Sequence, residues 1–119
     1  MSWVVLLADE FLPEFTRLPE QVRIEIEALS LLLVQFGPLL KRPHADTLKG
    51  SQHSNMKELR FKADGGVWRV AFAFDPIRNA ILLVAGDKSG VSQTQFYRRL
   101  IERADDRYRD HLERLESKE

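Results

Sequence analysis

Three consecutive segments in the middle of this 119-residue chain constrain its fold more than any other feature. Met56 to Ala63, Val67 to Phe74 and Ala80 to Gly86 are rich in β-branched and aromatic residues, a composition typical of strands. Only two short turns, at residues 64–66 and 75–79, separate them, so neighbouring strands should pair antiparallel. The third segment is apolar at both alternating positions. It should therefore lie centrally, covered on both faces.

Helical patterns precede these strands. Trp3 to Leu7 reads as a short strand, and Asp9 suits the N-cap of a short helical stretch. Pro19 suits the first turn of a longer helix that ends at Gly37-Pro38, and residues 37–55 then read as loop. The apolar residues that share one face of the longer helix are Val22, Ile26, Leu29, Leu33 and Phe36.

A last helix follows the strands. Ser92 and Gln95 have the spacing of a capping box at its start. Its apolar face is formed by Phe96, Leu100, Ala104, Tyr108, Leu112 and Leu115. The order β-α-α-β-β-β-α predicts an α+β fold: an antiparallel sheet with an N-terminal helix pair packed on it and a long C-terminal helix. Residues 1–119 are expected to form a single domain.

The residue types exclude several classes of site. The chain has no cysteine, so disulfides and thiolate metal ligands are excluded and a reducing cytoplasm is the expected compartment. His44, His53 and His111 show no metal-ligand spacing, and no nucleotide-binding glycine motif appears, so neither metal nor cofactor is expected. The apolar run from Trp3 to Ala8 is too short for a membrane span or a signal peptide, so no membrane association is expected.

Charge is unevenly distributed although the formal net charge is zero. Residues 1–40 are acidic and residues 70–119 are balanced. Between residues 41 and 69 the basic side chains outnumber the acidic ones; they are Lys41, Arg42, Lys49, Lys57, Arg60, Lys62 and Arg69. A polyanion, if one binds, should bind this basic middle. The alternative is that these basic side chains are only solvated at the surface and bind no polyanion.

Strand alternation brings two arginines together. In the first two strands of the middle segment, Arg60 and Arg69 lie opposite the bulky apolar positions, so pairing these strands puts both on one open face. Ala71 and Ala73 beside Arg69 leave a shallow concavity. Two guanidinium groups there suit a phosphate, because each offers a bidentate fork. The alternative is that Arg60 pairs with Glu58 or another carboxylate at the surface and binds no ligand.

Three further candidates lie near this face. Lys57 has the parity of the core face, so only a bulge or the strand edge would bring it into a site. Lys88 directly follows the last strand, and Tyr97 lies in the first turn of the last helix, where a tyrosine can also be a simple boundary residue. Clustered cations should lower the pKa of both Lys88 and Tyr97.

A long ordered series of short motifs runs through the same region. They are Arg42-Pro43-His44, Thr47 to Ser51, Asn55 to Arg60, Trp68 to Pro76, Gly86-Asp87-Lys88 and Phe96-Tyr97. Over roughly the whole chain, this series resembles the phage-derived Gp49-like branch of the RelE/HigB toxin family. The resemblance implies a cytoplasmic toxin of a type II toxin–antitoxin pair. Its implied activity is metal-independent cleavage of mRNA in the ribosomal A site, by attack of the 2′-hydroxyl on the neighbouring phosphate.

The resemblance also assigns residues. The family's second-strand arginine corresponds to Arg69, the basic residue after the last strand to Lys88, and the helix tyrosine to Tyr97. Arg60 and Lys57 are the candidates for the basic residues of the preceding strand, while Glu58 falls where RelE itself is basic. With Arg60 and Arg69 on the phosphate, Lys88 supports the transition state and Tyr97 transfers a proton or stacks on a base. Lys49, Lys57 and Lys62 are the RNA-binding candidates.

Two other functions stay open at this point. The fold also serves ParE-like toxins, which bind and inhibit DNA gyrase, and a degenerate non-toxic relative would only bind its antitoxin. The expected partners are mRNA, the ribosome and a cognate antitoxin, which is expected to be a small helix-turn-helix protein encoded by the adjacent gene. Leu31, Leu32 and Val34 lie off the main apolar face of the Pro19–Phe36 helix, so they are the candidate antitoxin dock, unless another part of the chain covers them.

Overall fold

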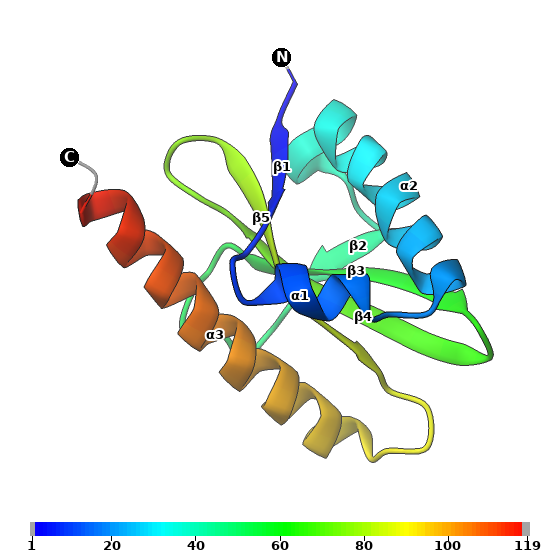
Figure 1. Ribbon diagram of the computed structural model, residues 1–119. Coiled ribbons are helices and arrows are strands. Elements are labelled where there is room, and N and C mark those ends of the chain that lie inside the picture. The colour runs from blue at the N-terminus through cyan, green and yellow to red at the C-terminus, as the bar shows by residue number, and fades with distance from the viewer. Residues whose placement is uncertain (1, 118–119) are drawn as a thin grey trace.

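The fold is built on a five-stranded sheet in the order β1-β5-β4-β3-β2 (Figure 1). The computed structural model describes residues 2–117. Its elements are β1 (Val4–Leu7), α1 (Phe11–Thr16), α2 (Glu20–Phe36), a 3-10 helix (Gly37–Leu39), β2 (Ala45–Thr47), β3 (Met56–Ala63), β4 (Gly66–Phe74), β5 (Asn79–Asp87) and α3 (Gln93–Ser117).

The three predicted central strands form the expected meander. β3 pairs antiparallel with β4, and β4 pairs antiparallel with β5. β1, however, pairs parallel with β5, so the sheet is mixed and the expectation of a wholly antiparallel sheet is wrong in this respect. The chain passes through α1, α2 and the meander between these two strands, and such a long connection permits the parallel pairing.

β5 is central, as its apolar residues predicted. It lies between β1 and β4, and residues 80–84 are buried without alternation. The helices explain this burial, because they cover opposite faces of the sheet. Leu82 lines a pocket with Ile26 of α2, whereas its neighbour Ile81 lines one with His111 of α3.

On α2, Val22, Ile26, Leu29 and Leu33 are buried as predicted, but Phe36 is exposed at the helix end.

The two helical layers also contact each other. Arg107 of α3 donates hydrogen bonds to both carboxylate oxygens of Glu14 of α1, at 2.8 and 2.6 Å, and to the carbonyl of Leu83 of β5. This bidentate pair links α1 to α3.

The region predicted to be loop, residues 37–55, contains both the 3-10 helix and β2. β2 has only three residues and no apolar alternation, so its sequence gives no strand signal. It forms because Ala45 to Thr47 pair with the outer edge of β3. No helix within residues 2–117 is both long and apolar enough to cross a bilayer.

Candidate functional site

Arg60 and Arg69 face each other across β3 and β4, as strand parity predicted. The face around them is not open, however. The Arg60 side chain is 20% exposed, but that of Arg69 is only 7% exposed. Arg69 donates from Nε to the Tyr97 hydroxyl at 3.2 Å and from Nη1 to the Trp68 carbonyl at 2.9 Å. The start of α3 therefore covers the end of the face where Arg69 lies.

A buried carboxylate, Glu58, joins these groups. Its side chain is 5% exposed and lies on the same face of β3 as Arg60. Glu58 Oε2 accepts from Arg60 Nη1 at 2.7 Å, Oε1 accepts from the Tyr97 hydroxyl at 2.9 Å, and Arg69 Nε lies 3.8 Å from Oε1. The alternative in which Arg60 pairs with Glu58 is thus correct about the pair, but the pair is buried in a network rather than solvated at the surface.

Two local features place Tyr97 against this pair. Gln95 donates its backbone N–H to Ser92 Oγ at 3.2 Å, which confirms the predicted cap of α3. Gly86 of β5 lets the helix approach closely, since a Cβ there would lie 3.0 Å from the Phe96 ring. Arg69 is the β4 partner of Gly86, so α3 begins directly above the arginine.

The network forms the floor of a cavity of about 430 Å³, which we name the cationic pocket. Its lining residues are Arg42, Asp46, Thr47, Leu48, Lys49, Glu58, Arg60, Lys88, Gln93 and Tyr97. Asp46 pairs with Arg42 at 2.9 Å, so the pocket holds two carboxylates among four cations. Lys49 and Lys88, which were predicted to belong to the site, line its walls. Arg42 was not predicted to do so, although it lies in the basic segment. A pocket with several cations over a polar floor suits a phosphate group.

The network shifts two pKa values in opposite directions. Partial burial lowers the pKa of the Lys88 ammonium, and the charges of Arg69 and Arg60 lower it further. Burial raises the pKa of the Tyr97 hydroxyl; the hydrogen bond from Arg69 opposes this shift, and the contact with Glu58 adds to it. The expectation that clustered cations lower both values is therefore confirmed for Lys88 and wrong for Tyr97.

The other two predicted RNA-binding lysines lie on opposite faces of β3. Lys57 lies on the opposite face of β3, where its ammonium donates to the carbonyl of Pro38 at 3.4 Å. The β3–β4 register is continuous, so no bulge brings Lys57 to the Arg60 face. Lys62 has the parity of Arg60 and lines a second pocket next to the cationic pocket, along the edge of β3.

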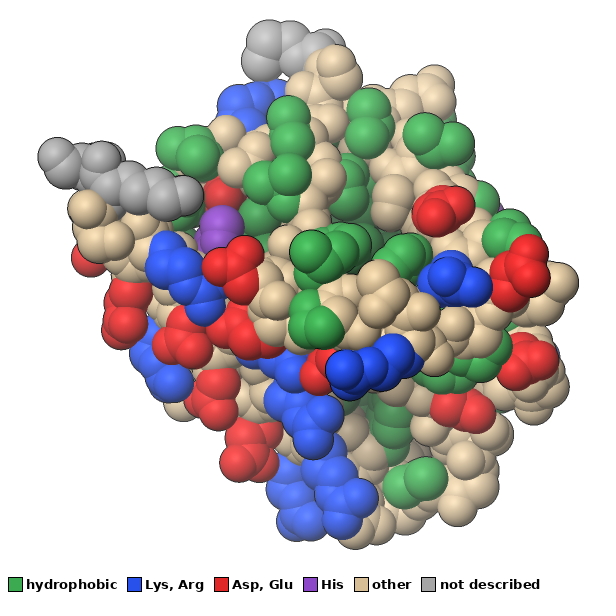
Figure 2. All heavy atoms as spheres, in the orientation of Figure 1, with side chains coloured by type: hydrophobic (Ala, Val, Ile, Leu, Met, Phe, Trp, Pro, Cys, Tyr) green, Lys and Arg blue, Asp and Glu red, His purple; other side chains and the backbone are tan. Residues whose placement is uncertain are grey.

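The three predicted partner-binding residues do not all lie on one surface. Leu31 is 71% exposed and, with the half-buried Val34, lines an apolar groove of about 530 Å³ between β1 and α2. Leu32 is half-buried and packs against the core instead. Figure 2 shows hydrophobic side chains gathered over this β1–α2 region, while Lys and Arg side chains gather over the start of α3. Among residues 2–117 no cluster of three metal-ligating side chains occurs.

Known proteins resemble the chain in sequence. The family model described as Phage derived protein Gp49-like (DUF891) matches residues 13–109. HigB2 of Mycobacterium tuberculosis, which is named as a toxin, is 46% identical over 86 residues, or 71% of this chain and 42% of HigB2. HigB3 of the same organism, also named as a toxin, is 52% identical over 59 residues, or 50% of each chain. The matched part thus spans half or less of the length of these relatives.

Two solved structures share the fold. A mutant of the E. coli toxin RelE in the free state aligns with a TM-score of 0.57 at 12% identity, covering 85% of this chain and 95% of RelE. The archaeal RelE–RelB complex from Pyrococcus horikoshii contains a chain that aligns with a TM-score of 0.54 at 15% identity, covering 76% of this chain and 100% of that chain. The predicted RelE-like fold is confirmed. Since the family model matches most of the sequence, including every residue that lines the cationic pocket, the chain belongs to the Gp49-like family of phage-derived proteins.

Proposed function

We propose that this chain is the toxin of a type II toxin–antitoxin pair and cleaves mRNA on translating ribosomes by attack of the substrate's own 2′-hydroxyl. The observation that carries the proposal is the contact of Arg60 and Tyr97 with Glu58 on the floor of the cationic pocket. The toxin names of the two Mycobacterium tuberculosis relatives and of RelE support it.

Binding of the substrate phosphate falls to the cations that line the pocket. Arg60 and Lys88 lie beside Glu58 and Tyr97 in the lining, so they would contact the scissile phosphate. Arg42 and Lys49 would contact the neighbouring phosphates of the strand. Arg69 does not line the cationic pocket, so it acts on this phosphate through its charge and by orienting Tyr97. Fixed cations stabilise the negative charge that the phosphate gains in the transition state.

The same groups account for the proton transfers. In the proposed step the 2′-oxygen forms a bond to phosphorus, and the bond between phosphorus and the 5′-oxygen breaks. Glu58 accepts the proton of the 2′-hydroxyl, and the Lys88 ammonium, with its lowered pKa, gives a proton to the departing 5′-oxygen. The raised pKa of Tyr97 keeps its hydroxyl protonated at neutral pH, so it donates to Glu58 and does not act as a base.

The products are a 2′,3′-cyclic phosphate and a 5′-hydroxyl. Because the substrate supplies the nucleophile and side chains offset the charge, the proposed reaction requires no metal or cofactor. Cells that express the chain should then accumulate cleaved mRNA, and Arg60→Ala should abolish both the new RNA ends and the growth arrest. Growth arrest with intact mRNA, accompanied by loss of gyrase supercoiling activity, would replace this proposal with the ParE-like alternative.

The proposed antitoxin docks in the apolar groove between β1 and α2. Leu31 and Val34 line this groove together with Val5, Leu7, Phe15 and Ile26. Apolar grooves that are partly exposed can bind an apolar face of a partner protein. The groove lies on the helix-covered face of the sheet opposite α3, so the antitoxin would have to extend around the sheet to block the cationic pocket directly.

A further inference from the structure

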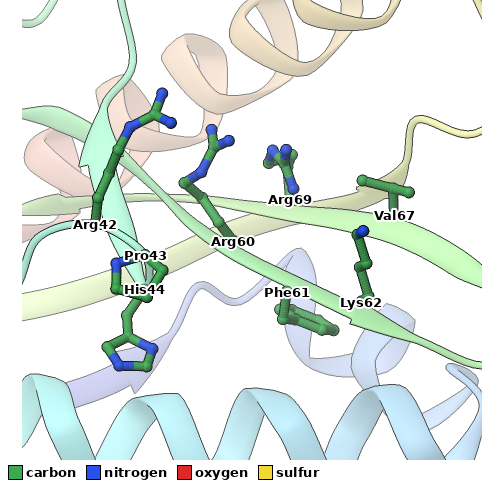
Figure 3. A pocket seen from close by; sticks show the side chains of 8 residues that line it. All are labelled: Arg42, Pro43, His44, Arg60, Phe61, Lys62, Val67 and Arg69. Carbon is green, nitrogen blue, oxygen red and sulfur yellow. The ribbon is translucent and has the colours of Figure 1, made fainter.

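A second pocket lies next to the cationic pocket, along the outer edge of β3 (Figure 3). It has a volume of about 630 Å³, and we name it the edge pocket. Its lining residues are Arg42, Pro43, His44, Arg60, Phe61, Lys62, Val67 and Arg69. β2 pairs with β3 only at Lys57 to Leu59, after which the His44 carbonyl accepts from the Arg60 N–H. From Phe61 onward the edge of β3 therefore borders the pocket instead of a strand.

The edge pocket combines cations with aromatic rings. Figure 3 shows the guanidinium groups of Arg42, Arg60 and Arg69 on one side of β3, and the rings of His44 and Phe61 on the other side. The His44 side chain is exposed, and that of Phe61 is half-buried. Among the described residues, those that line the edge pocket include four cations and no carboxylate, while Asp46 and Glu58 outside the lining pair with Arg42 and Arg60. Such a combination suits a ligand that is both anionic and planar.

The two pockets are continuous. Arg42 and Arg60 line both of them, so a strand that places one phosphate in the cationic pocket can pass directly into the edge pocket. A base is free to enter only when the strand is unpaired, because duplex bases remain stacked.

We infer that the edge pocket is a nucleobase-binding subsite: it holds the base next to the scissile phosphate of single-stranded RNA, stacked on the rings of His44 and Phe61. This inference rests on the proposed function. Arg42 and Lys62 contact the backbone on either side of the base. Stacking on a ring tolerates any base, so the subsite should accept different bases.

Equilibrium binding of an uncleavable RNA tests the subsite. A fluorescent 2′-O-methyl octamer is titrated with wild type, His44→Ala and Phe61→Leu, and dissociation constants are measured by anisotropy. Each variant should bind about 5- to 150-fold more weakly, the range of one lost base stack. His44→Phe should restore binding, because it restores the ring. Phe36→Ala is the matched control, since Phe36 is also partly exposed but does not line the pocket, and it should bind like wild type.

A scan of abasic sites separates stacking from charge. Removal of one base from the octamer should weaken binding by wild type, and His44→Ala should then cause no further loss. Suppose that Arg60→Ala weakens binding, that both ring variants bind like wild type, and that no abasic position changes the affinity. The subsite is then wrong, while the proposed function stands. If wild type binds no RNA, the subsite is overturned. If Arg60→Ala binds as tightly as wild type, the phosphate contact of the proposed function is overturned with it.

Discussion

The Tyr97 hydroxyl at the start of α3 donates a hydrogen bond to the Glu58 carboxylate of β3 at 2.9 Å. This contact joins two positions 39 residues apart and closes one end of the cationic pocket. Because Arg69 donates to the same hydroxyl at 3.2 Å, Tyr97 is held from both sides. The geometry favours a role for the hydroxyl itself over a role for the ring as a stacking surface.

Substitution of Tyr97 separates these two roles. Tyr97→Phe keeps the ring and removes the hydroxyl that orients Glu58, so the cleavage rate should fall by roughly 100-fold. If Tyr97 only stacked on a base, Tyr97→Phe would cleave at the wild-type rate and only Tyr97→Ala would be impaired. Tyr108→Phe is the control, because the Tyr108 hydroxyl donates to the Phe74 carbonyl away from the pocket. Wild-type rates for both Tyr97 variants would remove this residue from the site.

Arg69 should matter for stability as well as for activity. Its removal leaves the buried Glu58 and Tyr97 short of one partner, which should lower the free energy of unfolding by about 1–3 kcal/mol. The loss should be smaller when Glu58→Gln is also present, since that change removes the buried charge. Urea unfolding of the two single variants and the double variant measures this coupling. A variant Arg69→Ala as stable as wild type would mean that Arg69 lies on an open face after all.

Both tyrosines of the chain should ionise late. Burial raises the pKa of Tyr97 and of Tyr108 above the ordinary value of 10.0. A group with a raised pKa contributes stability that is complete below its unfolded value and is lost as the pH rises through its folded value. The tyrosinate absorbance of the folded chain should therefore have its midpoint at a higher pH than that of the chain in urea, which titrates near about pH 10. A folded chain that titrates like the unfolded one would contradict the burial of both hydroxyls.

The antitoxin groove predicts a difference between adjacent leucines. Leu31→Lys places a charge in the groove and should weaken capture of the adjacent gene's product at least tenfold without unfolding the chain. Leu32→Lys should destabilise the fold instead, because Leu32 packs against the core. Ile24→Lys is the control, since Ile24 is exposed on α2 but does not line the groove. Unchanged capture by Leu31→Lys would exclude the groove as the dock.

The sequence predicted those parts of the fold and site that depend on local periodicity. The alternation in the strands placed Arg60 and Arg69 on one face, and the capping residues at Ser92 located the start of the last helix. The burial of Arg69 could not be predicted in this way. It results from the packing of α3 against Gly86, a contact between distant segments that leaves no periodic signal.

The same reason explains the missed strand and the missed arginine. β2 exists only because β3 offers it an edge, and β2 with the turn before it brings Arg42 to the pocket. Glu58 had the correct parity to join the site. Its role could not be predicted from the resemblance, because an acidic residue at this position departs from the basic residues of RelE. The opposite pKa shifts of Lys88 and Tyr97 likewise depend on the three-dimensional position of Glu58.

The chemistry of the RNA ends tests the central claim most directly. The chain is added to a pre-formed ribosome complex whose mRNA carries a single 2′-deoxy substitution at the mapped cleavage position, and the products are compared with those of unmodified mRNA. The account predicts 2′,3′-cyclic or 3′-phosphate ends from the unmodified mRNA, no cleavage at the deoxy position, and cleavage that survives EDTA while the complex stays intact. Products with 3′-hydroxyl ends, or cleavage that proceeds at the deoxy position, would contradict attack by the 2′-hydroxyl and favour a water-dependent nuclease.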